Sequence, residues 1–510
     1  MSKGRRHGER RARRGGGAVE QISWRQVANP FPPLEAVSAD ELEAIHRASL
    51  RVLEEIGVDF LLPEARDMLE RAGADVAADG PRVRFDRAFI REAVARAPST
   101  FAVHARNPAR DLVFGGNAVN FAVVASAPNV SDLDRGRRPG NFEDYCNLVR
   151  LGQALNIAHL NAGYPVEPTD LPPPTRHLDA FLAQIRLSDK VYSGYALGRE
   201  RMVDFIEMAR MARGVDEARF EREPSLCTVV NANSPLQYDR PMLEGLIEMA
   251  RRNQVVVITP FTLAGAMAPV TVVGALVQQN AEALAGIAFA QVVRPGAPVM
   301  YGGFTSNVDM RTGSPAFGTP EYAKATLVGG QLARRVGVPF RASNATSANA
   351  PDGQAVYESE MSVWASVMAH ASLVKHGLGW LQGGLCASYE KLVLDAEMLQ
   401  AMAEFLTPLT VDDDALAVEA IAEVGPGGHF FSSSHTLARY ERAFYAPLVS
   451  DWRNFETWSA DGAVGATQWA NRIWKRLLAE YETPPLDPAI DEALADFVAR
   501  RKAEGGIAAA

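Results

Sequence analysis

The sequence is short of cysteine. It has three in 510 residues, Cys146, Cys227 and Cys386, and they lie far apart. This spacing excludes a disulfide scaffold and a paired-cysteine zinc site, and it is typical of a reducing compartment. An excess of positive charge is also missing, because the formal net charge is −9 at pH 7. We therefore expect a cytoplasmic protein whose body binds no nucleic acid.

Targeting and membrane signals are missing as well. The arginine-rich residues 1–17 are followed by no apolar region, which excludes a secretory signal, and residues 1–34 are predicted to be a disordered basic tail and lead-in. The most apolar stretch, residues 270–293, carries three side-chain amides and a glutamate near its middle. We expect it to be a core helix, and we expect no membrane association.

Several catalytic signatures are absent too. The sequence contains no GxSxG motif and no glycine loop before a lysine, so neither a hydrolase elbow nor a phosphate-binding loop is indicated. No lysine and no clear arginine falls at the end of a predicted strand, which disfavours Schiff-base chemistry. No HxH or HxxE pair lies on a predicted strand, which disfavours a zinc or iron hydrolase. We expect neither a metal site nor a nucleophile supplied by the protein.

What the sequence does contain is a regular alternation of strands and helices. Residues 255–258 are a β-branched run, residues 270–293 are helical in pattern, and residues 299–303 are a second strand, which together form a βαβ unit. Eight such strands and eight helices are predicted between residues 119 and 410. The alternation is compatible with a doubly wound open sheet, but the number eight favours a closed (β/α)₈ TIM barrel. The predicted strands are 121–126, 157–163, 191–196, 226–231, 255–258, 299–303, 340–344 and 380–387, and the seventh helix is predicted over 354–376.

The barrel is expected to carry an extension at each end. Residues 35–118 are predicted to form an N-terminal helical cap with a β-hairpin near residues 101–114. Residues 411–510 are predicted to form a glycine-rich loop, around Gly425-Pro426-Gly427-Gly428, followed by C-terminal helices. The domains expected from the sequence are thus 1–34, 35–118, 119–410 for the catalytic barrel, and 411–510.

The carboxyl ends of barrel strands are where such folds bind ligands. The residues predicted there are mostly neutral and aromatic, which suits a quaternary ammonium ion, because that ion has no N–H to donate and binds best against aromatic faces. Each ring taken singly also suits a barrel core, and Gln354 also suits the first turn of its helix. The predicted substrate-binding residues are Tyr164, Tyr195, Asn231, Asn233, Phe261, Phe304, Asn344, Gln354, Glu358, Gly383 and His429.

Three further residues carry chemistry that the strand ends do not require. His429 and His435 flank a short loop, and this spacing allows a metal site, although a helix-capping or lid role is favoured. Cys386 ends the predicted eighth strand but lacks an indicated histidine–aspartate partner. A small buried residue is the favoured interpretation of that cysteine.

Several dispersed segments resemble the trimethylamine methyltransferase superfamily over about residues 35–480. They are Phe101–Pro108, Pro260–Pro269 with Gln278-Gln279-Asn280, Arg294–Pro298, Gln382–Glu390 and Gly425–His429. The resemblance implies a TIM barrel that moves a methyl group from a methylated amine to the Co(I) of a separate corrinoid (cobalamin) protein. It implies no cofactor bound tightly by this chain itself. We also expect a homo-oligomer.

One window separates this chain from the founding members of that family, which carry pyrrolysine near the end of strand seven. The matching residues, 343–352, are SNATSANAPD and are all standard. The chain is therefore similar to the non-pyrrolysine branch, whose members demethylate quaternary amines such as glycine betaine. In methyl transfer from a quaternary nitrogen, the partner's cobalt attacks the methyl carbon and displaces the amine. This needs no nucleophile or general acid from the protein, because the amine leaves neutral.

The expected function is accordingly a corrinoid-dependent methyltransferase that acts on a glycine betaine-like quaternary amine. A non-catalytic barrel that binds quaternary amines would carry the same neutral, aromatic strand ends. The sequence is also compatible with a trimethylamine-type methyltransferase and with a metal-dependent barrel enzyme that uses His429, His435 or Cys386.

Overall fold

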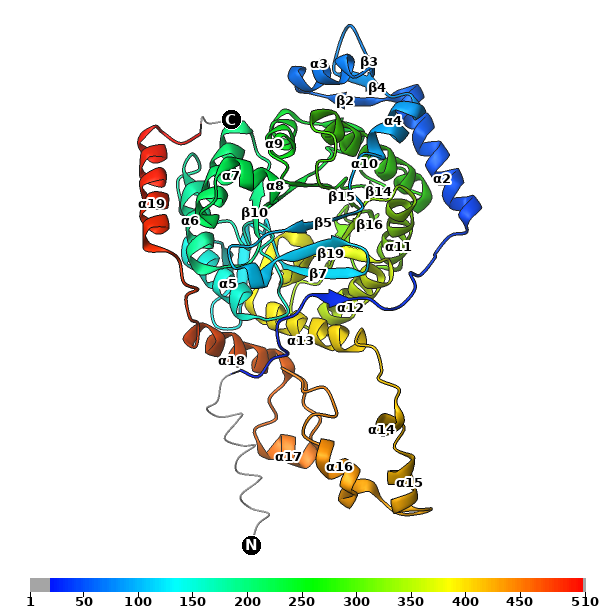
Figure 1. The fold of residues 1–510 in the computed structure, drawn as a ribbon, viewed down its shortest axis with the longest axis vertical. Coiled ribbons are helices and arrows are strands. Elements are labelled where there is room, and N and C mark those ends of the chain that lie inside the picture. Colours follow the sequence, from blue (N-terminus) through cyan, green and yellow to red (C-terminus); the bar gives the residue numbers. More distant parts are fainter. Residues whose placement is uncertain (1–18, 508–510) are drawn as a thin grey trace.

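The computed structural model describes residues 19–507 of the chain. The basic tail predicted at residues 1–17 lies outside the described residues. Within them, a barrel of strands and helices forms the body, a small helical unit lies at one end, and a long excursion extends from the opposite end (Figure 1).

A ring of parallel strands forms the centre of the body. Neighbouring strands pair in the order β7–β19–β18–β15–β13–β11–β10. The ring closes through Leu160, which bridges Ala122 on one side and Val191 on the other. This closed topology confirms the predicted TIM barrel, although the strand predicted at 157–163 is reduced to that one bridging residue. The strands are β7 (Ala118–Val123), β10 (Tyr192–Tyr195), β11 (Leu226–Val230), β13 (Val255–Ile258), β15 (Val299–Gly302), β18 (Phe340–Ser343) and β19 (Ala371–Leu378).

Eight helices surround the ring, and side-chain caps fix where many of them begin. Asn141, Asp239, Thr271, Thr319, Asp352 and Ser388 each accept a hydrogen bond from a backbone N–H of the first turn. The helices are α5 (Phe142–Ala154), α6 (Arg176–Leu187), α7 (Arg199–Arg213), α9 (Arg240–Arg251), α10 (Val272–Val293), α11 (Pro320–Arg335), α12 (Gly353–Met368) and α13 (Tyr389–Phe405). Helix α10 is long and apolar enough to cross a membrane, but 78% of its most apolar window is buried inside the protein, as expected for a core helix.

The prediction for the seventh helix and eighth strand is wrong. Helix α12 ends at Met368, well before residue 376, and the eighth barrel strand is β19, at Ala371–Leu378, rather than 380–387. The turn between them uses His370 in a left-handed conformation, with φ of 58°. A histidine is not the residue that ordinarily marks a helix end, so the sequence carries no glycine or proline signal there.

The amino end of the barrel is closed by a hairpin of β5 (Thr100–Val103) and β6 (Leu112–Gly115). Its buried residues Val103, Leu112 and Phe114 join the inward side chains of the barrel strands, such as Val257 and Met300, in one apolar cluster. This end of the barrel is therefore a packed floor, and a ligand has access only from the other end.

Smaller elements cover the outside of the ring. The N-terminal unit packs on α10 and contains α2 (Ala39–Arg51), α3 (Pro63–Arg71), α4 (Arg87–Val94) and the strands β2 (Val58–Phe60), β3 (Asp75–Val76) and β4 (Arg82–Arg84). Strand β12 (Gln237–Tyr238), from the segment after β11, pairs with β2 and joins this small sheet to the barrel. Two small sheets form the rim at the open end: β8 (Asn129–Asp132), β9 (Gly136–Pro139), β20 (Trp380–Leu381) and β21 (Cys386–Ser388) in one, and β14 (Leu263–Ala264), β16 (Ser306–Val308) and β17 (Pro315–Ala316) in the other. Strand β1 (Val27–Ala28) pairs with β7, and α8 (Glu217–Arg222) precedes β11.

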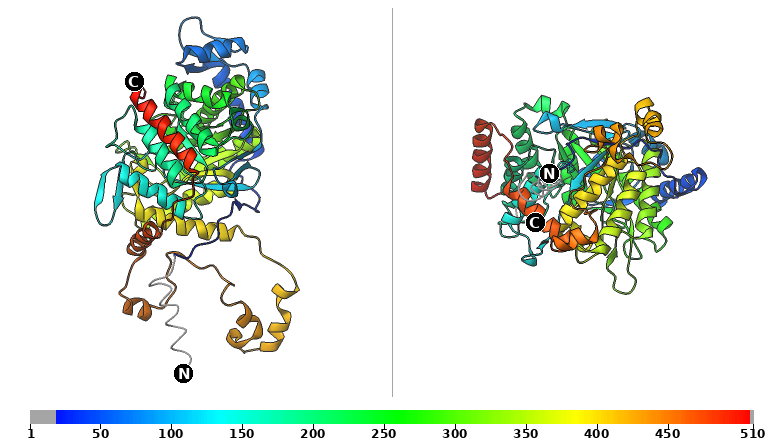
Figure 2. Two further views of the ribbon diagram at one scale, coloured as in Figure 1. Left: turned by 60° about the vertical axis from the view of Figure 1, so that its left-hand side comes forward. Right: turned by 90° about the horizontal axis from the view of Figure 1, so that it is seen from below.

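The C-terminal helices return to the barrel after a long excursion. Helix α18 (Ala466–Ala479) packs on α13, and α19 (Pro488–Ala503) packs on α6 and α7. Residues 407–465 lie between α13 and α18, and most of them project away from the body in two views (Figures 1 and 2), whereas Leu448 and Val449 pack against α13. We call this segment the arm. It contains α14 (Asp413–Leu416), α15 (Val418–Val424), α16 (Ser434–Arg439) and α17 (Phe455–Ala460).

Candidate active site

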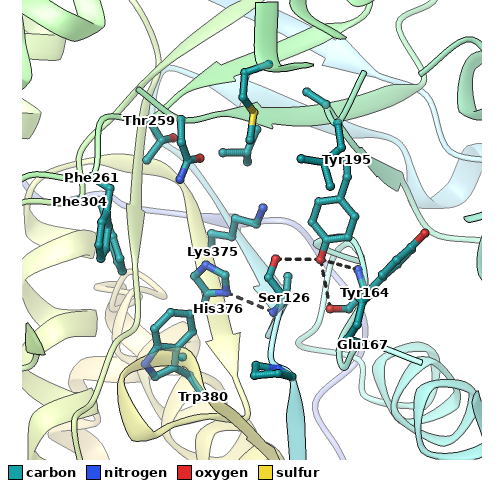
Figure 3. A pocket seen from close by; sticks show the side chains of 18 of the residues that line it. Ser126, Tyr164, Glu167, Tyr195, Thr259, Phe261, Phe304, Lys375, His376 and Trp380 are labelled. Atoms are coloured by element: carbon teal, nitrogen blue, oxygen red, sulfur yellow. Dashed lines mark hydrogen bonds between the residues drawn. The ribbon is translucent and has the colours of Figure 1, made fainter. Parts of the chain in front are cut away.

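A cavity of about 660 Å³ lies at the carboxyl ends of the barrel strands. Its volume is within the range of sites that hold small organic ligands. Figure 3 shows how the side chains from several strands converge on it. Six of the predicted substrate-binding residues line this cavity: Tyr164, Tyr195, Asn231, Phe261, Phe304 and Gly383.

Aromatic rings form two opposite walls of the cavity (Figure 3). On one side Phe261 stacks on Phe304 with ring centroids 5.1 Å apart, and Trp380 meets the edge of Phe304 at 6.1 Å. On the other side Tyr164 and Tyr195 pack perpendicular to each other, 4.7 Å apart. Such facing π surfaces favour a cation without N–H groups over a polar ligand.

The tyrosine wall is held by a short hydrogen-bond network at the end of β7. The Tyr195 hydroxyl lies 2.8 Å from Ser126 Oγ and accepts a hydrogen bond from the Tyr164 backbone N–H at 3.0 Å. Burial raises the pKa of Tyr195 above its usual value, so the phenol stays neutral. Ser126 itself has φ of 67°, a conformation that a non-glycine residue adopts rarely and that is found at functional sites.

Lys375 and His376 both face the cavity, although they are consecutive residues of β19. Consecutive strand residues normally point to opposite faces. Here the register between β19 and β7 shifts between Val374 and Leu378, and His376 has φ of 56°. This irregularity turns both side chains inward, and a strand irregularity beside a cavity is a known way of redirecting side chains.

His376 is a neutral hydrogen-bond donor to the cavity. Its Nδ1 accepts a hydrogen bond from the Ala125 backbone N–H at 3.2 Å, so the ring proton lies on Nε2. Burial, together with Lys375 and Arg341, lowers the pKa of His376 well below its ordinary value. The ring packs against Trp380, with centroids 4.4 Å apart.

Arg341 is a buried cation for which residues 19–507 provide no ion-pair partner. It is 3% exposed, and its Nε and Nη1 have no hydrogen-bond partner. Its guanidinium carbon lies 5.3 Å from the centre of the Phe304 ring, which provides part of its stabilisation. Burial lowers the pKa of Arg341 to about 10, so the side chain remains charged at neutral pH.

Lys375 shares this environment. It is 7% exposed, and burial followed by the nearby Arg341 lowers the pKa of its ammonium to about 7. The one carboxylate among the described residues that line the cavity is Glu167, and it is already paired with Arg176 at 2.6 Å. The cavity therefore carries buried positive charge that is not compensated by its lining, an arrangement that is costly unless a ligand supplies the anion.

Comparison with known proteins relates the chain to a family of methyltransferases. A family model for trimethylamine methyltransferase matches residues 2–506. The glycine betaine methyltransferase of Desulfitobacterium hafniense is 37% identical over 93% of this chain and 99% of its own length. A trimethylamine methyltransferase of the same species is 30% identical, covering 93% of this chain and 95% of that protein, and one of Methanosarcina mazei is 28% identical, covering 90% and 93%.

The chain belongs to the trimethylamine methyltransferase family. It is a methyltransferase, as the sequence analysis predicted, and the resemblance on which that prediction depended is confirmed.

Five predicted site residues lie outside the cavity of the methyltransferase. Two of them brace it: the Asn344 side chain donates to Gly377 O at 2.9 Å, and Glu358 accepts from the Ser347 backbone N–H at 2.9 Å. The Gln354 amide donates to Glu358 at 2.8 Å, and Asn233 bonds to Asp239 at 3.2 Å. His429 belongs to the arm and is exposed.

The expectation that no lysine or arginine lies at the strand ends is wrong, because Arg341 and Lys375 line the cavity. Arg341 was within a correctly predicted strand, and the alternation of that strand places it on the opposite face from Phe340. Lys375 and His376 were missed as site residues because the sequence pattern assigned them to the seventh helix. Trp380 was missed for the same reason, since it was placed at the start of the eighth strand rather than after its end.

The remaining candidates have other surroundings. Cys386 is fully buried, and burial raises the pKa of its thiol, which fits the favoured interpretation of a small buried residue. Among residues 19–507, no group of three histidine, cysteine or acidic side chains is arranged to hold a metal ion. His435 lies in α16 of the arm.

Proposed function

We propose that this methyltransferase transfers a methyl group from a betaine, a quaternary ammonium compound that carries a carboxylate, to the Co(I) of a partner corrinoid protein. The observation that carries the proposal is the buried pair Arg341 and Lys375, which no carboxylate of the described chain compensates. A substrate carboxylate bound there would supply the missing negative charge, and a guanidinium binds a carboxylate through two parallel hydrogen bonds.

The cationic end of the substrate would lie between the aromatic walls. Phe261, Phe304 and Trp380 on one side and Tyr164 and Tyr195 on the other present ring faces and neutral hydroxyls. A trimethylammonium group is too weakly hydrated to need hydrogen bonds, and desolvated cation–π contacts contribute about 2 kcal/mol each. The two ends of the cavity thus match the two charges of a betaine.

The protein's own contribution to the reaction is binding, orientation and exclusion of water. When the corrinoid partner is bound at the open end, its Co(I) supplies the nucleophile. The carboxylate, fixed by Arg341 and Lys375, holds the substrate so that one N-methyl group points away from the floor of the barrel. The C–N bond breaks with its electron pair retained by nitrogen, so the amine leaves neutral and no side chain must donate a proton.

Lys375 is the one lysine that lines the cavity within the described residues, and its low pKa makes it a second candidate acceptor for the methyl group. A bound carboxylate beside it would raise that pKa again and keep the ammonium charged, which removes its nucleophilicity. An anchoring role therefore fits the pair of cations better than a nucleophilic role.

Trimethylamine fits the cavity less well than a betaine. It has no carboxylate, so its binding would leave Arg341 and Lys375 without a counter-charge. A non-catalytic binder would use the same cavity, and turnover alone separates a binder from an enzyme. The three free cysteines are all buried, which is compatible with the reducing compartment that Co(I) chemistry needs, and we place the protein in the cytoplasm.

The test supplies purified protein with reduced cob(I)alamin or a reduced corrinoid protein and follows methylcobalamin formation. Glycine betaine and longer betaines are compared with choline, which has the same cation but no carboxylate, and with trimethylamine. We expect methyl transfer from at least one betaine and none from choline or trimethylamine. Equal turnover of choline and a betaine would contradict the carboxylate assignment, and ligand-induced stabilisation without transfer from any compound would indicate a binding protein.

A further inference from the structure

The arm exposes an amount of apolar surface that is unusual for a folded chain. Ten large apolar side chains within residues 408–444 are 45% to 91% exposed, among them Leu409, Val411, Phe431 and Phe444. All the hydrogen bonds and ion pairs found for this stretch among the described residues are internal to the arm, such as Arg439 with Asp414. Helices as short as α14, α15 and α16 are marginal by themselves, so this segment requires a surface to pack on.

The return limb of the arm is fastened to the body, and this fixes where the arm extends. Glu397 of α13 accepts hydrogen bonds from the backbone N–H groups of Leu448, at 2.5 Å, and Val449, at 2.7 Å. The outgoing limb starts at the end of α13, next to Phe405. Residues 408–444 therefore leave and rejoin the same helix while projecting away from the barrel (Figures 1 and 2).

A matching apolar surface lies on the barrel beside the root of the arm. Along α12, Tyr357, Met361 and Trp364 repeat at helical spacing and are 63%, 47% and 36% exposed. Trp364 meets Phe405 with ring centroids 4.9 Å apart, so this stripe continues to the point where the arm begins. The exposed face of the neighbouring helix α11 is polar by contrast, with Glu321 and Lys324. An outer barrel helix ordinarily presents polar residues to water.

We propose that two copies of this chain exchange their arms, each arm packing on the α12 stripe of the other copy. Donor and acceptor surfaces are both present on every chain, so a two-fold arrangement covers both at once, whereas an unrelated partner on the arm would leave the stripe exposed. The position of the stripe at the arm's root favours reciprocal exchange, because both arms then cross near the symmetry axis.

The available area is large enough for a stable dimer. At roughly 150 Å² for each large side chain, the exposed apolar residues of 408–444 offer on the order of 1,000 Å² per copy. A standard stable interface buries about 800 Å² per partner. The inference is independent of the methyl-transfer reaction, since it concerns assembly alone.

The first experiment measures the mass of the full-length protein in solution by light scattering across a concentration series. We expect twice the 55.2 kDa of one chain, or an even multiple of it. Phe431→Asp combined with Phe444→Asp on the arm, and Tyr357→Glu combined with Met361→Glu on α12, should each raise the dissociation constant about 30-fold or more. Ile56→Asp, at a 48% exposed apolar position of the N-terminal unit, is the matched control and should leave the mass unchanged.

The second experiment identifies which surfaces meet. Chains carrying Phe431→Cys are mixed with differently tagged chains carrying Tyr357→Cys, and a bismaleimide is added; the native cysteines are buried and give little background. Cross-links between the two tags support the exchange. The exchange is overturned if the wild-type protein is monomeric, or if it is a dimer whose dissociation constant neither double variant changes. It is also overturned if the two cysteines cross-link only when a single chain carries both of them. Protection of the arm from proteolysis that appears only after corrinoid protein is added would contradict it as well.

Discussion

The two ends of the barrel each contain a buried lysine, and the two lysines differ in whether the protein itself supplies hydrogen-bond acceptors for their ammonium groups. At the floor, Lys190 is fully buried, and its Nζ donates to the backbone carbonyls of Gly152, Leu155 and Ala158 at 2.6–2.9 Å. At the open end, the ammonium of Lys375 has no hydrogen bond or ion pair that we find in the described chain, and its neighbour is the cation Arg341. A buried polar group that is fully satisfied stabilises the fold, whereas one left unsatisfied is available for a ligand.

The same contrast applies to arginine. Arg213 is almost buried and is satisfied by Glu223 at 2.7 Å and by Ser225 at 2.7 Å. Arg341 is buried to a similar extent, but two of its nitrogens are without partners. A residue's type and burial are therefore insufficient to identify a site. The buried cations at the two ends of this barrel differ in how many of their hydrogen-bond donors lack a partner.

The sharpest test of this contrast is Arg341→Met. Loss of one partner from a buried charge pair costs about 3–4 kcal/mol, so kcat/KM for the betaine substrate should fall by roughly 100- to 1,000-fold. The protein should remain folded, since an unpaired buried charge is replaced by an apolar side chain of similar length. Initial rates of methylcobalamin formation measure the first effect and urea unfolding the second. An unchanged kcat/KM would remove Arg341 from the site.

Replacing the two lysines should give opposite results. Lys190→Met removes the buried ammonium that donates to three backbone carbonyls, of which Leu155 O keeps a second donor, the Ala158 N–H, and it should lower the free energy of unfolding by about 3 kcal/mol. Lys375→Met should leave stability unchanged or raise it, while weakening substrate binding. Urea midpoints and substrate titrations of both variants provide the measurements. Equal destabilisation by the two substitutions would show that Lys375 has a structural role as well.

The pH dependence of binding distinguishes an anchor from a nucleophile. Lys375 in the free site has a pKa of about 7, and a carboxylate binds its protonated form. Above that pKa, binding must be accompanied by proton uptake, so the dissociation constant should rise about tenfold between pH 6 and pH 8. A nucleophilic lysine would instead become more active over this interval. Calorimetric titration of a betaine at several pH values, with Lys375→Met as control, decides between them.

The smallest effect is expected at the aromatic wall. Phe304→Leu keeps an apolar surface but removes the π face, which should weaken binding of a quaternary amine by about 1–2 kcal/mol, or roughly 5- to 30-fold. An uncharged analogue, in which carbon replaces the quaternary nitrogen, should lose much less affinity from the same substitution. If both ligands weaken equally, Phe304 contributes shape rather than cation–π attraction.

The sequence predicted the strands and helices of the barrel more completely than it predicted the residues that line the cavity. The strand at Val255–Ile258 matched residue for residue, because a β-branched run buried on both sides has a strong pattern. The segment at 371–378 did not, because Lys375 and His376 interrupt its apolar run, and no glycine or proline separates it from α12. The cavity-lining residues Lys375 and His376 thus caused the error in the prediction, as expected where local preference and a role proposed for the site conflict.

The sequence by itself determined the alternation of strands and helices, the aromatic character of the strand ends and, through its resemblance, the family. Only the tertiary structure decided that two positive side chains share one cavity with no partner carboxylate in the described chain, and that the apolar side chains of the arm are left uncovered by residues 19–507. The reason is physical. Periodicity and residue type are local properties of the chain, but a missing partner depends on what surrounds a group in space, and those neighbours come from segments far apart in sequence.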